Sequence, residues 1–152
     1  DDAAHHYRTA IDLNPNFTAA FGYLGWALSH DGRSEEAIAN LEQAIRMSPR
    51  DPFNVFFLAG LAAAHYLAGR YDEAAEWARR ALQIRPGHLG ARRKYCASLA
   101  QSGHIEKAKQ EMDRLRQMQP DLSIAWIKRA VPYTARPMEH FLEGMRKAGL
   151  GD

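Results

Sequence analysis

Cysteine is nearly absent from this sequence of 152 residues, which contains it only at Cys96. A single cysteine cannot form a disulfide within the chain or supply a multi-cysteine metal site. Its place in a helical pattern predicts a packed small residue rather than a reactive thiol, because burial opposes the thiolate. A chain without disulfides suits a reducing compartment, and we therefore expect a cytoplasmic protein.

Long apolar stretches are also missing. No run approaches the roughly 18 residues that a membrane-spanning helix requires, although 46% of the residues are hydrophobic. The first residues, DDAAHH, have neither the basic start nor the apolar core of a secretory signal peptide. The chain has no initiator methionine and begins as if within a helix. We therefore expect a fragment of a longer protein, without a membrane contact.

Motifs for catalysis, cofactor binding and metal coordination are missing as well. The seven histidines include no i, i+4 ligand pair of the kind that zinc sites use. His5 and His6 are neighbours, which places them about 100° apart on a helix. No nucleophile elbow or phosphate-binding loop occurs. We expect no enzyme activity, no cofactor and no native metal site.

Proline, glycine and alanine instead recur at a fixed period. The prolines that mark it are separated by 34, 37 and 34 residues and are Pro15, Pro49, Pro86 and Pro120. Each of the last three is preceded by a glycine and then an alanine at constant distances: Gly32 and Ala37, Gly69 and Ala74, Gly103 and Ala108. Such a glycine allows a positive φ in a turn, the alanine allows two helices to approach, and the proline ends a helix. A period in this range predicts a stacked array of helix pairs.

The residues at these positions resemble the tetratricopeptide repeat family. The stretch 18–51 carries the family's large, small and proline positions as Phe21, Leu24, Gly25, Leu28, Ala37, Leu41, Ala44 and Pro49. Two later stretches repeat the pattern, although Arg92 stands where an aromatic residue is expected. The resemblance implies an all-α fold, namely a right-handed α-solenoid of antiparallel helix pairs with a C-terminal capping helix.

The resemblance treats residues 1–152 as a single array. The implied division is a partial repeat at 1–17, full repeats at 18–51, 55–88 and 89–122, and the start of a degenerate repeat at 123–133. Pro132 and Pro137 then bracket a break in the pattern. Apolar residues at helical spacing predict a capping helix over 138–148, because arrays need a polar outer face at their ends.

The family resemblance also implies a binding surface. The first helices of such repeats line a concave groove in which a peptide or a helical segment of a partner binds. Most groove-facing positions here are alanine or glycine, and the bulky or charged residues at or beside them are Tyr23, Trp26, Phe56, Tyr66, Arg93 and Lys94. We expect these six residues to form the peptide-binding groove of a protein–protein interaction module. Packing against a neighbouring helix is the alternative for each aromatic residue.

Charge is distributed unevenly along the chain. Residues 1–69 contain four arginines against eight acidic residues, a balance of −4, whereas residues 70–129 contain thirteen basic against seven acidic residues, a balance of +6. The basic run at 92–94 favours an acidic peptide as ligand. No row of exposed aromatic residues interleaves with the basic runs, which argues against nucleic acid as a partner.

The N-terminal end of the array predicts a further contact. Residues 3–13 have the pattern of the second helix of a repeat whose first helix is absent, so one side of this helix would be uncovered. Self-association through this open end, or fraying of residues 1–10, would relieve the exposure.

A second, looser resemblance rests on residues 51–64 and 141–150. These phrases resemble segments from the C-terminal repeat arrays of bacterial signalling proteins. The resemblance implies an alternative function as a regulatory or oligomerisation segment of a larger bacterial signalling protein, such as a nucleotide cyclase or a transcription regulator.

Overall fold

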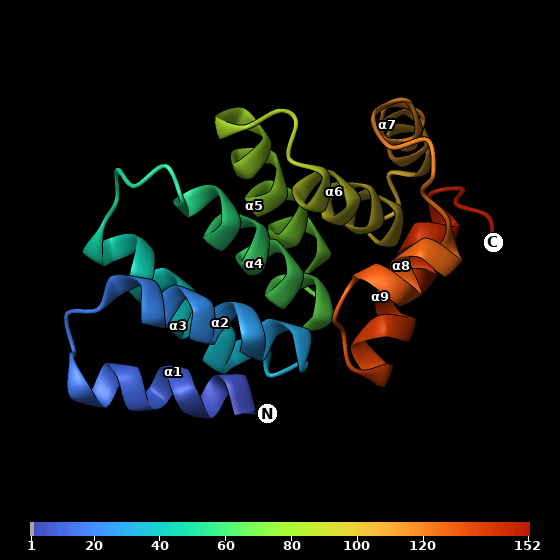
Figure 1. Ribbon diagram of the computed structural model, residues 1–152. Coiled ribbons are helices and arrows are strands. Elements are labelled where there is room, and N and C mark those ends of the chain that lie inside the picture. The colour runs from blue at the N-terminus through green and yellow to red at the C-terminus, as the bar shows by residue number, and fades with distance from the viewer. Residues whose placement is uncertain (1) are drawn as a thin grey trace.

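The computed structural model describes residues 2–152, and this part of the chain consists of α-helices and their connections without any β-strand (Figure 1). The helices are α1 (Asp2–Leu13), α2 (Thr18–His30), α3 (Ser34–Met47), α4 (Asn54–Leu67), α5 (Tyr71–Ile84), α6 (Leu89–Gln101), α7 (Ile105–Met118), α8 (Ile124–Ala130) and α9 (Ala135–Lys147). The expected all-α array of helix pairs is confirmed. Within residues 2–152, no helix is both long enough and apolar enough to cross a membrane.

Three helix pairs, α2–α3, α4–α5 and α6–α7, follow one another along the array. In Figure 1 the first helices α2 and α4 lie nearer the viewer, and their partners α3 and α5 lie behind them. The neighbouring first helices pack on one another as well, α2 on α4 and α4 on α6. The first helices therefore share one face of the array, as the repeat pattern predicts.

A glycine closes the turn within each helix pair. Gly32, Gly69 and Gly103 have φ values of 76°, 81° and 89°, in the left-handed region that favours glycine. The residue after each glycine donates its amide to a carbonyl in the preceding helix, for example Arg70 N to His65 O at 2.9 Å. This bond satisfies a carbonyl that the end of the helix would otherwise leave without a partner. The periodic glycines therefore predict these turns correctly.

Small residues set the distance between the two helices of a pair. A Cβ atom added to Gly25 in α2 would lie 2.9 Å from the carbonyl oxygen of Ala37 in α3, so only glycine fits there. The periodic alanines Ala37, Ala74 and Ala108 are each 0% exposed. Close backbone approach at these positions explains why the sequence repeats small residues there.

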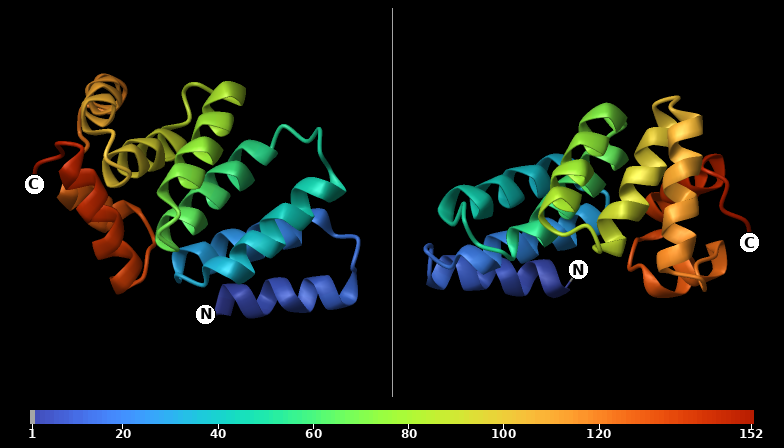
Figure 2. Two further views of the ribbon diagram at one scale, coloured as in Figure 1. Left: turned by 180° about the vertical axis from the view of Figure 1, so that it is seen from behind. Right: turned by 90° about the horizontal axis from the view of Figure 1, so that it is seen from above.

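The C-terminal helices depart from the repeat. The short helix α8 begins where the Ser123 hydroxyl accepts a hydrogen bond from the Trp126 amide at 3.0 Å. Helix α9 begins at Ala135, three residues before the predicted start, and Pro137 lies inside its first turn rather than in a break. The first turn tolerates proline because its amides have no partner within the helix. Figure 2 shows α9 lying against α6, and it also contacts α4.

A buried ion pair joins α6 to α7. Arg92 Nη1 donates to Glu111 Oε2 at 2.6 Å, and the two side chains are only 11% and 9% exposed. A second guanidinium, that of Arg114, reaches the other oxygen of Glu111 at 3.1 Å. Arg92, which stands where the family pattern has an aromatic residue, is therefore accommodated by a carboxylate on the partner helix.

Replacing Glu111 with alanine is expected to lower the free energy of unfolding by about 3 kcal/mol, because the Arg92 charge would stay buried without a partner. Urea denaturation followed by circular dichroism measures the change. Asp113→Ala on the same helix removes an exposed carboxylate that lies 3.7 Å from Arg116, and should cost less than about 1 kcal/mol. Equal losses in the two variants would contradict the role of the buried pair.

Candidate peptide-binding groove

The C-terminal half of the concave face is covered by α9. A Cβ atom added to Gly144 in α9 would lie 3.0 Å from the Ala97 Cβ and 3.1 Å from the Ala97 carbonyl oxygen in α6, and still closer to the Tyr66 hydroxyl. Ala97 is 0% exposed, and Phe141 of α9 is 1% exposed. The small residues that the sequence places in this part of the groove therefore accommodate a helix of the same chain.

Tyr66 lies beneath α9 and is 1% exposed. Its hydroxyl donates to the carbonyl oxygen of His140 at 2.6 Å and accepts a bond from the Gln101 side chain at 3.2 Å. Burial raises the pKa of the Tyr66 hydroxyl. The prediction that Tyr66 binds a peptide is corrected here, because its ring and hydroxyl are already used to hold α9.

The loop before α9 extends to the first full helix pair. The Thr134 amide and hydroxyl both donate to the carbonyl oxygen of His30 at the end of α2, at 3.1 and 3.3 Å. The Tyr133 ring stacks on the His30 ring with 4.8 Å between centres. Burial lowers the pKa of His30 to about 4, although the ring bonds the Trp26 carbonyl oxygen at 2.8 Å. This contact marks the limit of the covered part of the groove.

Arg93 and Lys94 are engaged within the protein. Arg93 donates to the Gln119 side chain at 3.0 Å, and its guanidinium lies 5.0 Å from the centre of the Trp126 ring. Burial lowers the pKa of Lys94 to about 7, and its nearest acceptor is the Gly90 carbonyl oxygen at 3.5 Å. An acidic ligand would have to compete with these internal contacts for Arg93 and reach an ammonium group that burial disfavours.

The N-terminal half of the concave face remains open, and aromatic side chains line it. A cleft of about 310 Å³, here called the aromatic cleft, is bounded by Tyr7, Tyr23, Trp26, Phe53, Phe56 and Phe57. Trp26, Phe53 and Tyr23 are 41%, 38% and 37% exposed, so three large apolar side chains are accessible around one cleft. Of the six residues predicted from the sequence, Tyr23, Trp26 and Phe56 thus lie together at one cleft.

Contacts between rings hold the aromatic cleft in shape. Tyr23 meets Phe53 edge to face at 5.9 Å between centres and lies 5.7 Å from Tyr7 of α1. The Phe57 ring packs directly on Gly22, where any Cβ would collide with it. These arrangements are favourable for aromatic pairs and leave one face of the cleft free.

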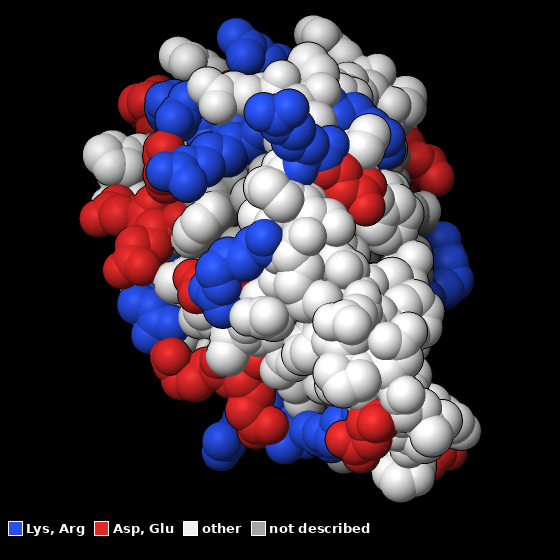
Figure 3. All heavy atoms as spheres, turned by 90° about the vertical axis from the view of Figure 1, so that its left-hand side faces the viewer, with Lys and Arg blue, Asp and Glu red and all other residues white. Residues whose placement is uncertain are grey.

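Two further clefts continue the aromatic cleft along α2. The Pro132 cleft, about 160 Å³, shares Trp26 with it and is lined by Ala3, Ala4, Trp26, Ala27, His30, Asp31 and Pro132. The Phe17 cleft, about 540 Å³, lies at the other end and is lined by Phe17, Thr18, Ala19, Tyr23, Asp51, Phe53 and Phe57. Figure 3 faces the end of the molecule at which α2 begins and shows a broad uncharged area there, with basic side chains gathered above it.

Phe53, Tyr7 and Phe57 were missed as site residues from the sequence. Phe53 lies at the start of α4, before the first groove position of its repeat, so the repeat register did not include it. Phe53, Phe56 and Phe57 stand at positions i, i+3 and i+4, which lie on one face of a helix. This spacing predicts that the three rings lie together at the start of α4.

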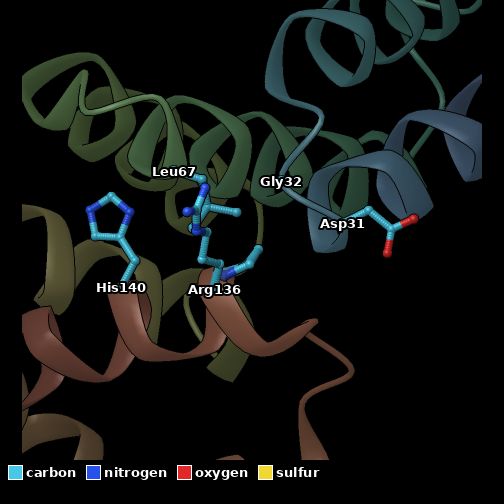
Figure 4. Close-up of a pocket in the computed structure, with 6 residues that line it drawn as sticks. Asp31, Gly32, Leu67, Arg136 and His140 are labelled. Atoms are coloured by element: carbon cyan, nitrogen blue, oxygen red, sulfur yellow. The ribbon is translucent and has the colours of Figure 1, made fainter.

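A separate polar cleft of about 330 Å³ lies where α9 meets the turn between α2 and α3. It is lined by Asp31, Gly32, Leu67, Arg136, Pro137 and His140 (Figure 4). The Pro137 ring forms one wall of this cleft. It lies close to Gly32, since a Cβ added to Gly32 would be 3.1 Å from Pro137 Cγ. This cleft lies at the boundary between α9 and the first full helix pair and shares Asp31 with the Pro132 cleft.

The structure also shows the surroundings of the single cysteine and of the possible metal ligands in residues 2–152. Cys96 is 0% exposed and burial raises its pKa to about 12, so it is the packed residue that the sequence predicts. No group of three or more His, Cys, Asp or Glu side chains in this part of the chain is placed to hold a metal ion.

Comparison with known families gives matches over most of the chain. A family described as tetratricopeptide repeat matches residues 1–52 and 24–88, and a second family of the same description matches residues 65–130. The curated relative Cell division cycle protein 27 homolog B of Arabidopsis thaliana is 37% identical over 57 residues. That match covers 38% of this chain and 8% of the plant protein, so the chain spans a small part of its length.

Two solved structures share the arrangement of the helices. The crystal structure of MamA has a TM-score of 0.68 at 16% identity, covering 95% of this chain and 85% of MamA. YrrB, described as a TPR protein with an unusual peptide-binding site, has a TM-score of 0.63 at 20% identity, covering 95% of this chain and 74% of YrrB. At these identities the likeness concerns the fold.

Replacing Gly144 with leucine is expected to detach α9 from α6. Overpacking costs about 1–3 kcal/mol, which exceeds the gain of up to about 1 kcal/mol in helix propensity. Hydrogen exchange read by mass spectrometry should show faster exchange over 135–147. Gly87→Leu is the matched control, since nothing lies within 4 Å of a Cβ there. Unchanged protection of α9 in Gly144→Leu would contradict the close contact.

Proposed function

Because the chain belongs to the tetratricopeptide repeat family, we propose that it is a non-catalytic protein-interaction module. It binds a peptide or a helical segment of a partner protein in the open, N-terminal half of its concave groove. The description of YrrB, a protein of the same fold with a peptide-binding site, supports this class of ligand. We propose a cytoplasmic location because the single cysteine, Cys96, is buried and free, as suits a reducing compartment.

The observation that carries the proposal is the exposure of the aromatic cleft. Contiguous exposed apolar surfaces of some size mark interaction sites. Trp26, Tyr23 and Phe53 are each more than a third exposed around one cavity. Tryptophan and tyrosine are also the residues that dominate the binding energy of interfaces.

Part of the set of binding residues predicted from the sequence lies in the open half of the groove. Tyr23, Trp26 and Phe56 stay in the proposal and Phe53 joins them, since all four line the aromatic cleft. Tyr66, Arg93 and Lys94 are left out of the proposed binding site. Helix α9 covers Tyr66, internal contacts occupy Arg93, and burial disfavours the charged form of Lys94.

Trp26→Ala is expected to weaken binding of a groove peptide about thirtyfold, since truncation of an interface anchor costs about 2 kcal/mol or more. Peptides selected from a random display library on the full chain serve as probes, and fluorescence anisotropy gives the dissociation constants. Ile84→Ala is the control: it removes an exposed apolar side chain that lines none of these clefts. Equal affinities for Trp26→Ala and the unchanged protein would refute the assignment.

A second candidate function, self-association, is favoured by the surface of α1. Ala3 and Ala10 stand one repeat before Ala37 and Ala44, which are 0% exposed between the helices of their pair. Ala3 is exposed and Ala10 is only half-buried, because within residues 2–152 α1 packs mainly on the helix that follows it, α2. A second copy of the chain could cover this surface.

The self-association proposal predicts a molecular mass that rises with protein concentration. Ala10→Arg should keep the protein monomeric, because it places a charge in the middle of the uncovered surface. Thr9→Arg, on the exposed outer side of the same helix, should not. Sedimentation equilibrium over a range of concentrations measures both. A monomer at every concentration in the unchanged protein would rule this candidate out.

A further inference from the structure

We infer that the ligand of the open groove is a peptide segment in which a large apolar residue is flanked by lysine or arginine. The inference rests on the proposed function and names the chemistry of its ligand. It follows from the charged groups at the two ends of the continuous surface formed by the Pro132 cleft, the aromatic cleft and the Phe17 cleft.

A carboxylate stands at each end of this continuous surface. Asp31 follows the last residue of α2 and lines the Pro132 cleft, and Asp51 precedes α4 and lines the Phe17 cleft. No lysine or arginine is among the residues that line these three clefts in the described chain. Arg85 comes near the surface, with its guanidinium 5.5 Å from the centre of the Phe56 ring, but it lines none of the clefts.

Both carboxylates are available to a ligand. Asp51 is exposed, and one of its oxygens, Oδ1, accepts the Phe53 amide at 2.9 Å, which leaves the other oxygen for a partner. Asp31 is partly exposed and belongs to none of the ion pairs of residues 2–152. Residues 1–69, which supply all the lining residues of the three clefts except Pro132, carry four basic against eight acidic side chains.

The aromatic walls add a second attraction for cations. A lysine or arginine side chain placed over the exposed face of Tyr23 or Trp26 gains a cation–π interaction. An acidic ligand would lose this term and would also meet the carboxylates. The cationic groups on which an acidic ligand would depend, Arg93 and Lys94, are withdrawn into the contacts described above. Charge complementarity therefore favours a basic segment.

The spacing of the two carboxylates sets the spacing of the cations. Asp31 and Asp51 lie at opposite ends of α2, which has 13 residues and is thus about 20 Å long at 1.5 Å per residue. An extended peptide covers this distance with about six residues at roughly 3.3 Å each. The inferred ligand thus carries two basic residues about six positions apart, with the apolar anchor between them.

Selection from a library of random dodecapeptides displayed on phage tests the inference. The full chain and its Trp26→Ala variant are panned in parallel, and peptides enriched only on the unchanged chain are sequenced. We expect these peptides to combine a large apolar residue with a net positive charge. Binding of the synthetic peptides should weaken as salt is raised.

A paired neutralisation separates the charge effect from the apolar one. Asp31→Asn with Asp51→Asn keeps an acceptor for the Phe53 amide and should weaken binding of the selected peptides about fivefold, the effect of two exposed ion pairs. Asp113→Asn with Asp121→Asn removes two exposed carboxylates outside the clefts and should have no effect.

The outcomes of the selection distinguish the two proposals. Peptides that depend on Trp26 but are neutral or acidic would overturn the inference and leave the proposed function standing. No peptide that depends on Trp26 would overturn both. Association of two copies of the chain that Trp26→Ala abolishes, without peptide binding, would show that a second copy occupies the groove and would also overturn the inference.

Discussion

At several places where two helices of residues 2–152 approach closely, a glycine stands at the contact. The carbonyl oxygen of Ala37 would lie 2.9 Å from a Cβ at Gly25, and the Leu41 side chain lies 3.1 Å from where a Cβ of Gly60 would be. At Gly144 the same kind of contact is made between α9 and α6. Protein interiors are packed as densely as organic crystals, so an added methyl group at Gly25 or Gly144, where it would meet the backbone of the neighbouring helix, would force the two helices apart. The position of every helix pair, and of α9 upon them, depends on these contacts.

The same contacts decide which part of the concave face can accept a ligand. Because Ala97 is small, α9 comes near the backbone of α6, and the Tyr66 hydroxyl then bonds the His140 carbonyl oxygen at 2.6 Å. A segment of the same chain occupies this half of the groove without the loss of translational and rotational freedom that association costs. A separate peptide would incur that loss on binding. Thr134 completes the boundary through its bonds to the His30 carbonyl oxygen. In residues 2–152 the N-terminal half of this face stays uncovered.

The repeat could be predicted from the sequence because its signals are local. A glycine with positive φ, as at Gly69, and a buried alanine such as Ala74 have the same role in each unit, whatever surrounds them. The site could be predicted only in part. Which groove residues stay exposed depends on where α9 packs, and the repeat pattern does not extend to this helix. The repeat pattern therefore predicts that Tyr66 binds a ligand, although α9 covers it. The pattern leaves out Phe53 because this residue precedes the first groove position of its repeat.

One position of the repeat explains why the two halves of the groove differ. Trp26, Ala63 and Ala97 occupy the same place in three successive units, since they stand nine residues into the stretches that begin at 18, 55 and 89. Ala97 lets the backbone of α9 approach, and Ala63 is 1% exposed beside it. In α2 the same place holds the indole of Trp26. The backbone of another helix or of a peptide therefore cannot approach α2 as closely as α9 approaches α6. In the proposed binding mode, a ligand of the open half is therefore held by its own side chains rather than by close backbone contact, and the aromatic walls and the flanking carboxylates select those side chains by their chemistry.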